Sequence, residues 1–326
     1  MRIQIVISAY DASTYYRLVL PADAMEADIV TVKPDDPRLG DADIVWFCRY
    51  GLTDFTYARR KGAKIVMDLD DYWHLYPSHV LFQSWKDLGI PKMITDNLKR
   101  ADMVFCTSNT LRTSIREYNS NVHTIYNALP YGVEQFTPEV RPMGSPLTFL
   151  WAGGASHLTD LRMMQDSLRR ISKDDTLKNS MRFVLGGASE NDVWTKIKSL
   201  FDITGVAEYR DALPLHMYMD VYKEADIVFA PLANNVFNRH KSFLKVLEAA
   251  VHKKPILVSG VRPYTDIHPS YVVHVGKSWY GDIKDAVKNP RELMEKAEAL
   301  HEYCSSCFHL KDWAARRMEL FHKLLR

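Results

Sequence analysis

Four charged side chains recur at helical spacing in the last third of the chain: Lys241, Lys245, Glu248 and His252. Their separations of four, three and four residues predict that they share one face of a helix over 241–251. Cationic side chains at the start of a helix, with its free backbone N–H groups, can neutralise a diphosphate, and Arg239 would add a further cation. A glutamate further along the same face can accept hydrogen bonds from ribose hydroxyls. The pattern therefore predicts a site for a nucleotide diphosphate.

The rest of this helix is apolar around almost its whole circumference, from Phe243 to Val251. A helix of this kind must be largely buried, so its charged stripe is expected to open onto a cavity. The alternative is a solvent-exposed face carrying ordinary lysine–glutamate pairs. The absence of polar residues elsewhere on the helix favours the cavity.

Three aspartates lie together in the segment "KIVMDLDDYWHL": Asp68, Asp70 and Asp71. They follow an apolar run that reads as a strand. A D-x-D pair could hold a divalent cation, crowded carboxylates could act as acid or base, and aspartates also cap turns. We favour a mixed structural and substrate-orienting role, in which Asp70 and Asp71 pair with Arg49 and orient the hydroxyl groups of an acceptor.

A glycine pair, Gly153 and Gly154, directly follows another apolar strand and precedes a helix. Glycines at such a place let the backbone approach a ligand closely with its N–H groups. A tight turn is the simpler explanation of the pair. His157, at the start of the helix, could contact the acceptor or the transferred group. A histidine at the start of a helix is, however, more often a polar residue with no functional role.

The composition is that of a globular protein with room for two domains: 326 residues, of which 47% are hydrophobic and 25% are charged. The net charge of +2 neither demands nor excludes nucleic acid. Cys304 and Cys307 form a lone C-x-x-C, too little for a convincing zinc site. No apolar run has the length of a membrane span, and "MRIQIVISAY" reads as a first strand, so a cytoplasmic protein is the default expectation.

Short apolar strands alternate with helical segments along the chain, which predicts parallel sheets covered by helices on both faces. The expected strands include 44–48, 64–68, 147–151 and 226–230, and the expected helices include 15–25, 158–171 and 241–251. The proline-rich stretch 127–146 interrupts this alternation and reads as a linker. We therefore expect an α/β protein with two Rossmann-like, doubly wound domains facing a cleft. The expected limits are 1–143 for an acceptor-side domain, 144–300 for a nucleotide-binding domain, and 301–326 for a C-terminal helix packing back toward the first domain.

The segment "FNRHKSFLKVLEAAVHKKPILVSGVRPYTDI" resembles the donor-site region of GT-B glycosyltransferases, particularly bacterial and phage enzymes of the family 4 type. "TFLWAGGASHLTDL" and "RFVLGG" resemble the first two strands of their donor domain, and "ADMVFCTSNTLRTSIREY" with "HTIYNAL" resembles the end of their acceptor domain. The resemblance spans most of the chain. It implies a retaining, metal-independent transfer of a hexose or pentose from a nucleotide-diphosphate sugar linked to uridine or guanosine.

One departure from the family pattern affects the site. Many family 4 enzymes have two glutamates separated by seven residues; Glu248 matches the second, but His240 stands in place of the first. The sugar contacts of that first glutamate therefore do not carry over. The branch that this chain resembles has a K-S-x-L-K-x-x-E pattern, matched here by Lys241, Ser242, Leu244, Lys245 and Glu248.

The resemblance and the residue patterns together predict three groups of site residues and no metal ligand. Diphosphate stabilisation during catalysis is assigned to Lys245, Lys241 and Arg239. Nucleotide-sugar binding is assigned to Glu248, Gly153, Gly154, Ser242, Asn238 and Leu244. The acceptor side is assigned to Asp70, Asp71, Arg49 and His157.

A glycosyltransferase is thus the expected function, with no cofactor beyond its donor substrate. Two alternatives stay open: a nucleotide-sugar epimerase of the same fold, and a catalytically silent module that binds a sugar nucleotide or nucleic acid. The sequence leaves the acceptor open among a glycan, a lipid-linked sugar, a protein and a modified DNA base. It also leaves the oligomeric state open.

Overall fold

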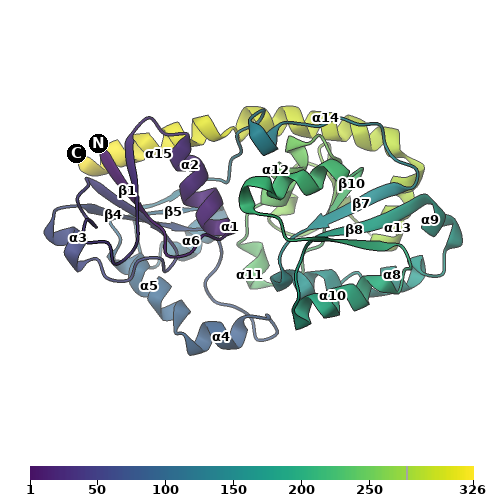
Figure 1. Ribbon diagram of the computed structural model, residues 1–326, viewed down its shortest axis with the longest axis horizontal. Coiled ribbons are helices and arrows are strands. Elements are labelled where there is room, and N and C mark those ends of the chain that lie inside the picture. Colours follow the sequence, from purple (N-terminus) through teal and green to yellow (C-terminus); the bar gives the residue numbers. More distant parts are fainter. Residues whose placement is uncertain (277) are drawn as a thin grey trace.

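A computed structural model of the chain describes residues 1–276 and 278–326 and contains two α/β domains side by side (Figure 1). The first domain is built on a six-stranded parallel sheet with the order β2-β1-β3-β4-β5-β6. Its strands are β1 (Arg2–Val6), β2 (Asp28–Val32), β3 (Ile44–Cys48), β4 (Lys64–Leu69), β5 (Met103–Cys106) and β6 (Val122–Thr124). The order doubles back at β1, as in a doubly wound sheet.

The second domain repeats this architecture with the strand order β12-β11-β10-β7-β8-β9, again parallel. Its strands are β7 (Leu147–Ala152), β8 (Met181–Ala188), β9 (Ala207–Asp211), β10 (Ile227–Ala230), β11 (Ile256–Ser259) and β12 (Val273–Val275). The central strands β3, β7 and β10 are buried along their whole length, because helices cover both faces of each sheet. The predicted fold, two Rossmann-like domains facing a cleft (GT-B), is confirmed.

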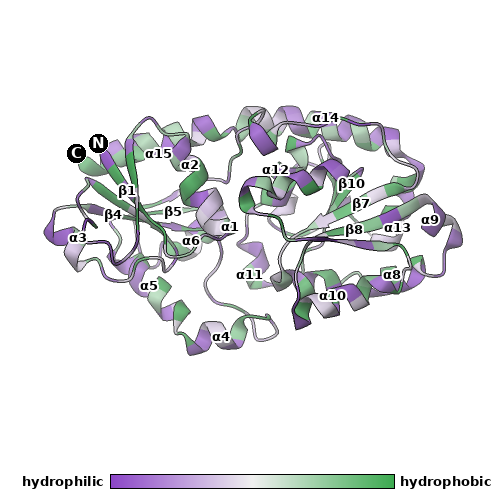
Figure 2. Cartoon of the chain, in the orientation of Figure 1, coloured by the Kyte–Doolittle hydropathy of each residue, from purple (hydrophilic) through white to green (hydrophobic). Residues whose placement is uncertain are grey.

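Helices flank both sheets, and hydrophilic and hydrophobic residues alternate along α14 (Pro290–Cys307; Figure 2). In the first domain the helical segments are α1 (Ala12–Thr14), η1 (Tyr15–Val19), α2 (Leu20–Asp23), α3 (Thr56–Arg60), α4 (Phe82–Asp87), α5 (Ile90–Arg100), α6 (Asn109–Ile115) and η2 (Glu134–Phe136). In the second they are η3 (Ala155–His157), α7 (Leu158–Arg162), α8 (Gln165–Ile171), α9 (Asp175–Ser180), α10 (Asp192–Asp202), η4 (Leu215–Glu224), α11 (Val236–Arg239), α12 (Leu244–Val251), η5 (Tyr264–Asp266) and α13 (Trp279–Lys288). No helix in the described ranges has the length and apolar character needed to cross a bilayer.

The chain ends in two helices, α14 (Pro290–Cys307) and α15 (Leu310–Leu325), which run along one side of both domains (Figure 1). α14 packs on α12 of the second domain. α15 packs on the first, where Leu320 and Phe321 join the core beside Trp46 and Phe105. The C-terminal segment thus connects the two domains a second time, in addition to the linker.

Three predicted helices differ in the structure. The helix expected over 241–251 begins only at Leu244, so Lys241 precedes it in an irregular segment after α11. The stretch 158–171 is divided into α7 and α8, and 15–25 contains a π-helical turn, η1. The end of α12, at Val251, is where the apolar pattern predicts it.

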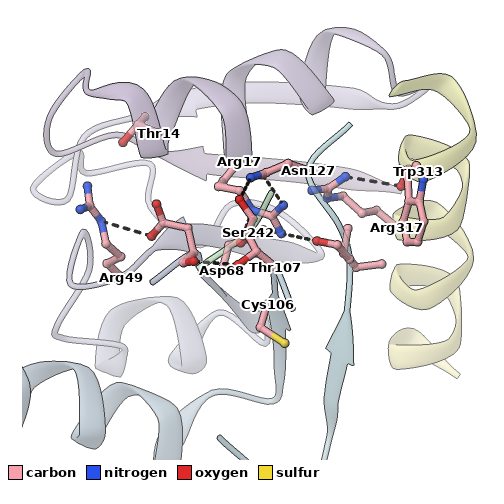
Figure 3. A network of polar contacts seen from close by, with 12 residues as sticks. Thr14, Arg17, Arg49, Asp68, Cys106, Thr107, Asn127, Ser242, Trp313 and Arg317 are labelled. Carbon is pink, nitrogen blue, oxygen red and sulfur yellow. Dashed lines mark hydrogen bonds and ion pairs between the residues drawn. The ribbon is translucent and has the colours of Figure 1, made fainter. Parts of the chain in front are cut away.

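A buried ion pair in the first domain is linked by hydrogen bonds to the linker and, through it, to the second domain (Figure 3). Arg17, on η1, is 1% exposed and donates to Asp68 at the end of β4, with 2.7 Å between Nε and Oδ1. It also donates to the Asn127 side chain at 2.9 Å and to the Ile125 carbonyl at 2.9 Å. Asn127 in turn donates to the Ser242 hydroxyl of the second domain at 2.8 Å. Asp68 is therefore a structural residue.

Replacing Arg17 by Met is predicted to destabilise the first domain strongly. The Asp68 carboxylate would remain buried without its partner, and breaking a buried ion pair costs about 3–5 kcal/mol. Lys92→Met is the matched control, because the Lys92–Asp96 pair is exposed and such a pair contributes about 0.3–0.5 kcal/mol. Urea unfolding followed by circular dichroism measures both variants. Equal effects of the two substitutions would contradict the structural role of Arg17.

Candidate active site

A cavity of about 520 Å³ lies between the domains. It opens where strands of both sheets end: Asp70 follows β4, Gly153 follows β7 and Leu232 follows β10. Ligands of doubly wound sheets bind at these carboxyl ends, and the volume is in the range of small-molecule sites. All predicted site residues except Arg239 line the cavity: Lys241, Lys245, Glu248, Gly153, Gly154, Ser242, Asn238, Leu244, Asp70, Asp71, Arg49 and His157.

Arg239 and one member of the predicted charged stripe, His252, do not line the cavity. Arg239 is exposed on α11 and donates to the Asn234 side chain at 3.0 Å. His252 is 1% exposed and lies behind the cavity, stacked on Tyr222 with 6.2 Å between ring centroids. The expectation that His252 faces the cavity is wrong, because α12 turns its last residues into the core of the second domain.

The three aspartates point to three different cations. Asp68 binds Arg17, as described above. Asp70 lies 3.9 Å from Arg49, measured from Oδ1 to Nε. Asp71 reaches across the cleft to Lys241 of the second domain, with 3.0 Å between Oδ2 and Nζ. This divergence does not favour a shared metal, and in the described ranges no three His, Cys, Asp or Glu side chains gather as a metal site, around Cys304 and Cys307 included.

Arg49 has an unusual backbone, with φ at +55°, directly after β3. Non-glycine residues at positive φ are uncommon and often occur at functional sites. Its side chain binds the Asp11 carboxylate and lies beside Asp70. Burial alone would raise the pKa of Asp70, but the Arg49 charge and the Ser13 hydroxyl outweigh it and lower that pKa. Asp70 therefore presents a carboxylate to the cavity.

Several contacts tie the first domain to the segment before α12. The Tyr72 ring stacks on the His240 ring at 4.4 Å. The His240 carbonyl accepts a hydrogen bond from the Ser108 hydroxyl at 2.9 Å. Nε2 of the His240 ring lies 2.9 Å from the Ser114 hydroxyl. His240, where the family pattern has glutamate, is thus used for contact between the domains.

Glu248 is the centre of a second contact between the domains. Its carboxylate is 1% exposed and accepts hydrogen bonds from Tyr16 of the first domain at 3.1 Å and from Tyr222 at 2.6 Å. Lys245 donates to it at 2.8 Å and to Tyr218 at 2.6 Å. Burial alone would lower the pKa of Lys245, but the Glu248 charge and the Tyr218 hydroxyl raise it. Lys245 therefore stays cationic in the cavity.

The glycine loop after β7 is closely packed. Gly187, in β8, has φ at +101°, and a Cβ atom there would lie 2.4 Å from the Gly153 carbonyl oxygen. A side chain at Gly153 would meet the Trp151 ring at 2.8 Å, whereas Gly154 has open space. Glycine is thus required at 153 and 187 for the packing of two strand ends, and Gly154 leaves the backbone accessible.

His157 is held by a residue that the sequence pattern did not identify. Its Nδ1 lies 2.8 Å from Oδ2 of Asp160, whose other oxygen accepts from the Ala233 amide and the Asn238 side chain, both at 2.8 Å. Asn238 therefore uses its amide within the protein. Asp160 has a sequence signal, three residues after His157 on α7, but Tyr16, Tyr218 and Tyr222 have none, because they come from segments far apart in the chain.

No family model matches the sequence, and no curated protein matches it. Its fold does match solved structures over nearly the whole chain. One is the sucrose-phosphate synthase of Thermosynechococcus elongatus, with a TM-score of 0.75 and 13% identity over 99% of this chain and 98% of that chain. Another is Anabaena HepE in complex with UDP-glucose, with a TM-score of 0.73 and 12% identity over 99% of this chain and 100% of that one.

A third match is TarM, with a TM-score of 0.63 and 13% identity over 85% of this chain and 54% of that chain. Identities this low establish a common fold. The chain therefore shares with these proteins the GT-B arrangement of two Rossmann-like domains around a cleft.

His79, in the cavity wall, is predicted to make the folded protein less stable at acidic pH. Burial, with Lys241 and His157 nearby, lowers the pKa of His79 to about 4, whereas an unfolded histidine has a pKa of about 6.5. Below about pH 6.5 the His79 imidazole binds a proton in the unfolded chain but stays neutral in the folded chain. The free energy of unfolding therefore decreases as the pH falls from about 6.5 to 4, by up to about 3 kcal/mol.

Urea unfolding at several pH values measures this loss. His79→Gln should flatten the pH dependence between pH 6.5 and 4, because glutamine does not titrate in this range. His252 stays in the variant, and burial lowers its pKa to about 4 as well, so part of the loss remains. An unchanged slope in His79→Gln would contradict the burial of a neutral imidazole at this position.

Proposed function

We propose that the protein is a glycosyltransferase that binds a nucleotide-diphosphate sugar in the cavity and transfers the sugar to an acceptor with retention of configuration and without a metal. The observation that carries this proposal is the position of Lys241 and Lys245. Both line the interdomain cavity, Lys241 just before α12 and Lys245 in its first turn, and the glycine loop after β7 lines the same cavity. Two cations and accessible backbone at adjoining strand ends suit a diphosphate.

Each lysine has a carboxylate partner in the structure: Asp71 for Lys241 and Glu248 for Lys245. The Lys241–Asp71 pair is partly exposed, with 18% and 37% of the two side chains accessible. A diphosphate entering the cavity would replace Asp71 as the partner of Lys241. Lys245 has little room to move, since Tyr218 and Glu248 both hold its ammonium group. Lys241 is therefore the adaptable cation and Lys245 the fixed one.

During transfer, the bond between the anomeric carbon and the diphosphate oxygen breaks, and the diphosphate leaves with the electron pair. The two lysine charges would stabilise this developing negative charge, which is the main electrostatic task of the reaction. Ser242 lines the cavity between them and is held by Asn127. Arg239 would contribute only through its long-range charge, because its side chain lies outside the cavity.

Glu248 is proposed to bind the ribose. A carboxylate has about four acceptor positions, and three donors already occupy Glu248. A ribose hydroxyl would take the remaining position or replace Tyr16, which belongs to the opposite domain. Gly154 and Leu244 would lie against the nucleotide sugar.

The acceptor is proposed to enter along the first domain, past Asp70, Asp71 and Arg49, with His157 facing it from the second domain. The solved structures of similar fold support a uridine diphosphate sugar as donor, because HepE is described in complexes with UDP and with UDP-glucose.

UDP is predicted to raise the melting temperature of the purified protein, and Lys245→Ala is predicted to remove most of this shift because the fixed cation is lost. Lys288→Ala is the matched control, an exposed lysine at the end of α13. GDP should be run in parallel to identify the nucleobase. A protein whose melting temperature responds to neither diphosphate would refute the donor site.

Transfer or slow release of free sugar from a nucleotide sugar is predicted to continue in excess EDTA, since lysines take the diphosphate charge. Proton NMR of the first product formed should show the anomeric configuration of the donor. Restoration by Mn²⁺ or Mg²⁺ of an activity lost in EDTA would return Asp70 and Asp71 to a metal-binding role. An inverted anomer would contradict retention, and an epimeric nucleotide sugar would identify an epimerase.

A further inference from the structure

The His157 side chain is fixed by hydrogen bonds that run through the buried carboxylate of Asp160. Its Nδ1 lies 2.8 Å from Oδ2 of Asp160, a carboxylate that is 3% exposed. Oδ1 of Asp160 accepts from the backbone N–H of Ala233 and from Nδ2 of Asn238, each at 2.8 Å. Three segments, the start of α7, the loop after β10 and α11, therefore converge on one buried carboxylate.

These contacts determine the polarity of the imidazole. Burial alone would raise the pKa of Asp160, but the hydrogen bonds from His157 and from the Ala233 amide lower it, so the carboxylate is ionised. An ionised carboxylate only accepts hydrogen bonds, so Nδ1 of His157 must donate. In a neutral imidazole the other nitrogen, Nε2, then carries a lone pair and no proton.

The free side of this imidazole faces the cavity. His157 lines it and is 24% exposed at its side chain, and among the described residues Nε2 has no hydrogen-bond partner. Across the cleft are Tyr76 and His79 of the first domain, whose rings contact Phe237 next to Asn238. His157 thus stands between the glycine loop of the second domain and the acceptor wall of the first.

We propose that His157 accepts a hydrogen bond from a hydroxyl group of the transferred sugar, and that Asp160 is the positioning residue that keeps Nε2 unprotonated for this purpose. The assignment to the transferred sugar follows from the place of His157 in the loop after β7, beside Gly153 and Gly154. This inference rests on the proposed donor site. It adds a requirement: the sugar must present a hydroxyl hydrogen, and not only an oxygen, to His157.

Asp160→Asn tests the inference because the structure dictates how the new amide is oriented. Its oxygen must face the two N–H donors of Ala233 and Asn238, so its NH₂ group faces Nδ1 of His157. Nδ1 must then accept, and the imidazole proton moves to Nε2. The substitution keeps the shape of the site and reverses its polarity from acceptor to donor.

The first measurement reads the tautomer in the free protein by long-range ¹H–¹⁵N NMR, with His157→Gln to identify the signal. The Nδ1–H form is expected in the unchanged protein and the Nε2–H form in Asp160→Asn. The same tautomer in both proteins would overturn the positioning role of Asp160. This measurement needs no ligand, so it stands whether or not the donor site is correct.

The second measurement is the Kd of UDP-glucose and of its monofluorinated analogues, in each of which one sugar hydroxyl is replaced by fluorine, a group that cannot donate. In the unchanged protein one analogue is expected to bind roughly 10- to 100-fold more weakly, because Nε2 is left without a donor. Asp160→Asn is expected to lose this discrimination at that position. Asp166→Asn, an exposed aspartate on α8, is the matched control and should keep it.

The outcomes separate the two proposals. If neither UDP nor GDP binds, the donor site fails. If UDP binds while UDP-glucose binds no more tightly, or all fluorinated analogues bind alike in both proteins, the donor site survives and the sugar contact of His157 is refuted. A thermal melt of each variant shows whether it is folded, and His157→Gln provides a second variant, with the buried carboxylate left intact.

Discussion

The buried guanidinium of Arg17 holds together the parts that form the cleft. It binds the carboxylate that ends β4, the carbonyl of Ile125 just after β6 and the side chain of Asn127 at the start of the linker. Through Asn127 it is connected to Ser242 in the cavity wall. Because a buried charge must remain paired, this network constrains where the linker leaves the first domain, and hence where the second domain begins.

Charges in the cavity are balanced by contacts between the domains. Asp71 and Tyr16 of the first domain bind Lys241 and Glu248 of the second. A substrate that binds these groups must therefore compete with contacts that close the cleft. Binding at these groups would therefore alter contacts that hold the two domains together, and closure around a substrate would exclude water from the cavity.

The sequence was a good guide to the fold, because both domains rely on strongly apolar central strands. β3 has the predicted bounds, and β4, β7 and β10 differ by one residue at one end. The short strands β9 and β12 gave no clear sequence signal, because their residues are only partly buried and so lack a continuous apolar pattern. Helix bounds were less certain, as the late start of α12 and the break between α7 and α8 show.

The sequence by itself determined most of the charged residues that gather at the cleft, because the carboxyl ends of parallel strands meet at one edge of each sheet. It could not determine their partners. That Asp68 binds Arg17, that Asp71 binds Lys241 and that Tyr16 reaches Glu248 depends on packing between segments up to 232 residues apart. Only the tertiary structure decided these pairs, since a hydrogen bond depends on distance and direction, which spacing along the chain does not encode across domains.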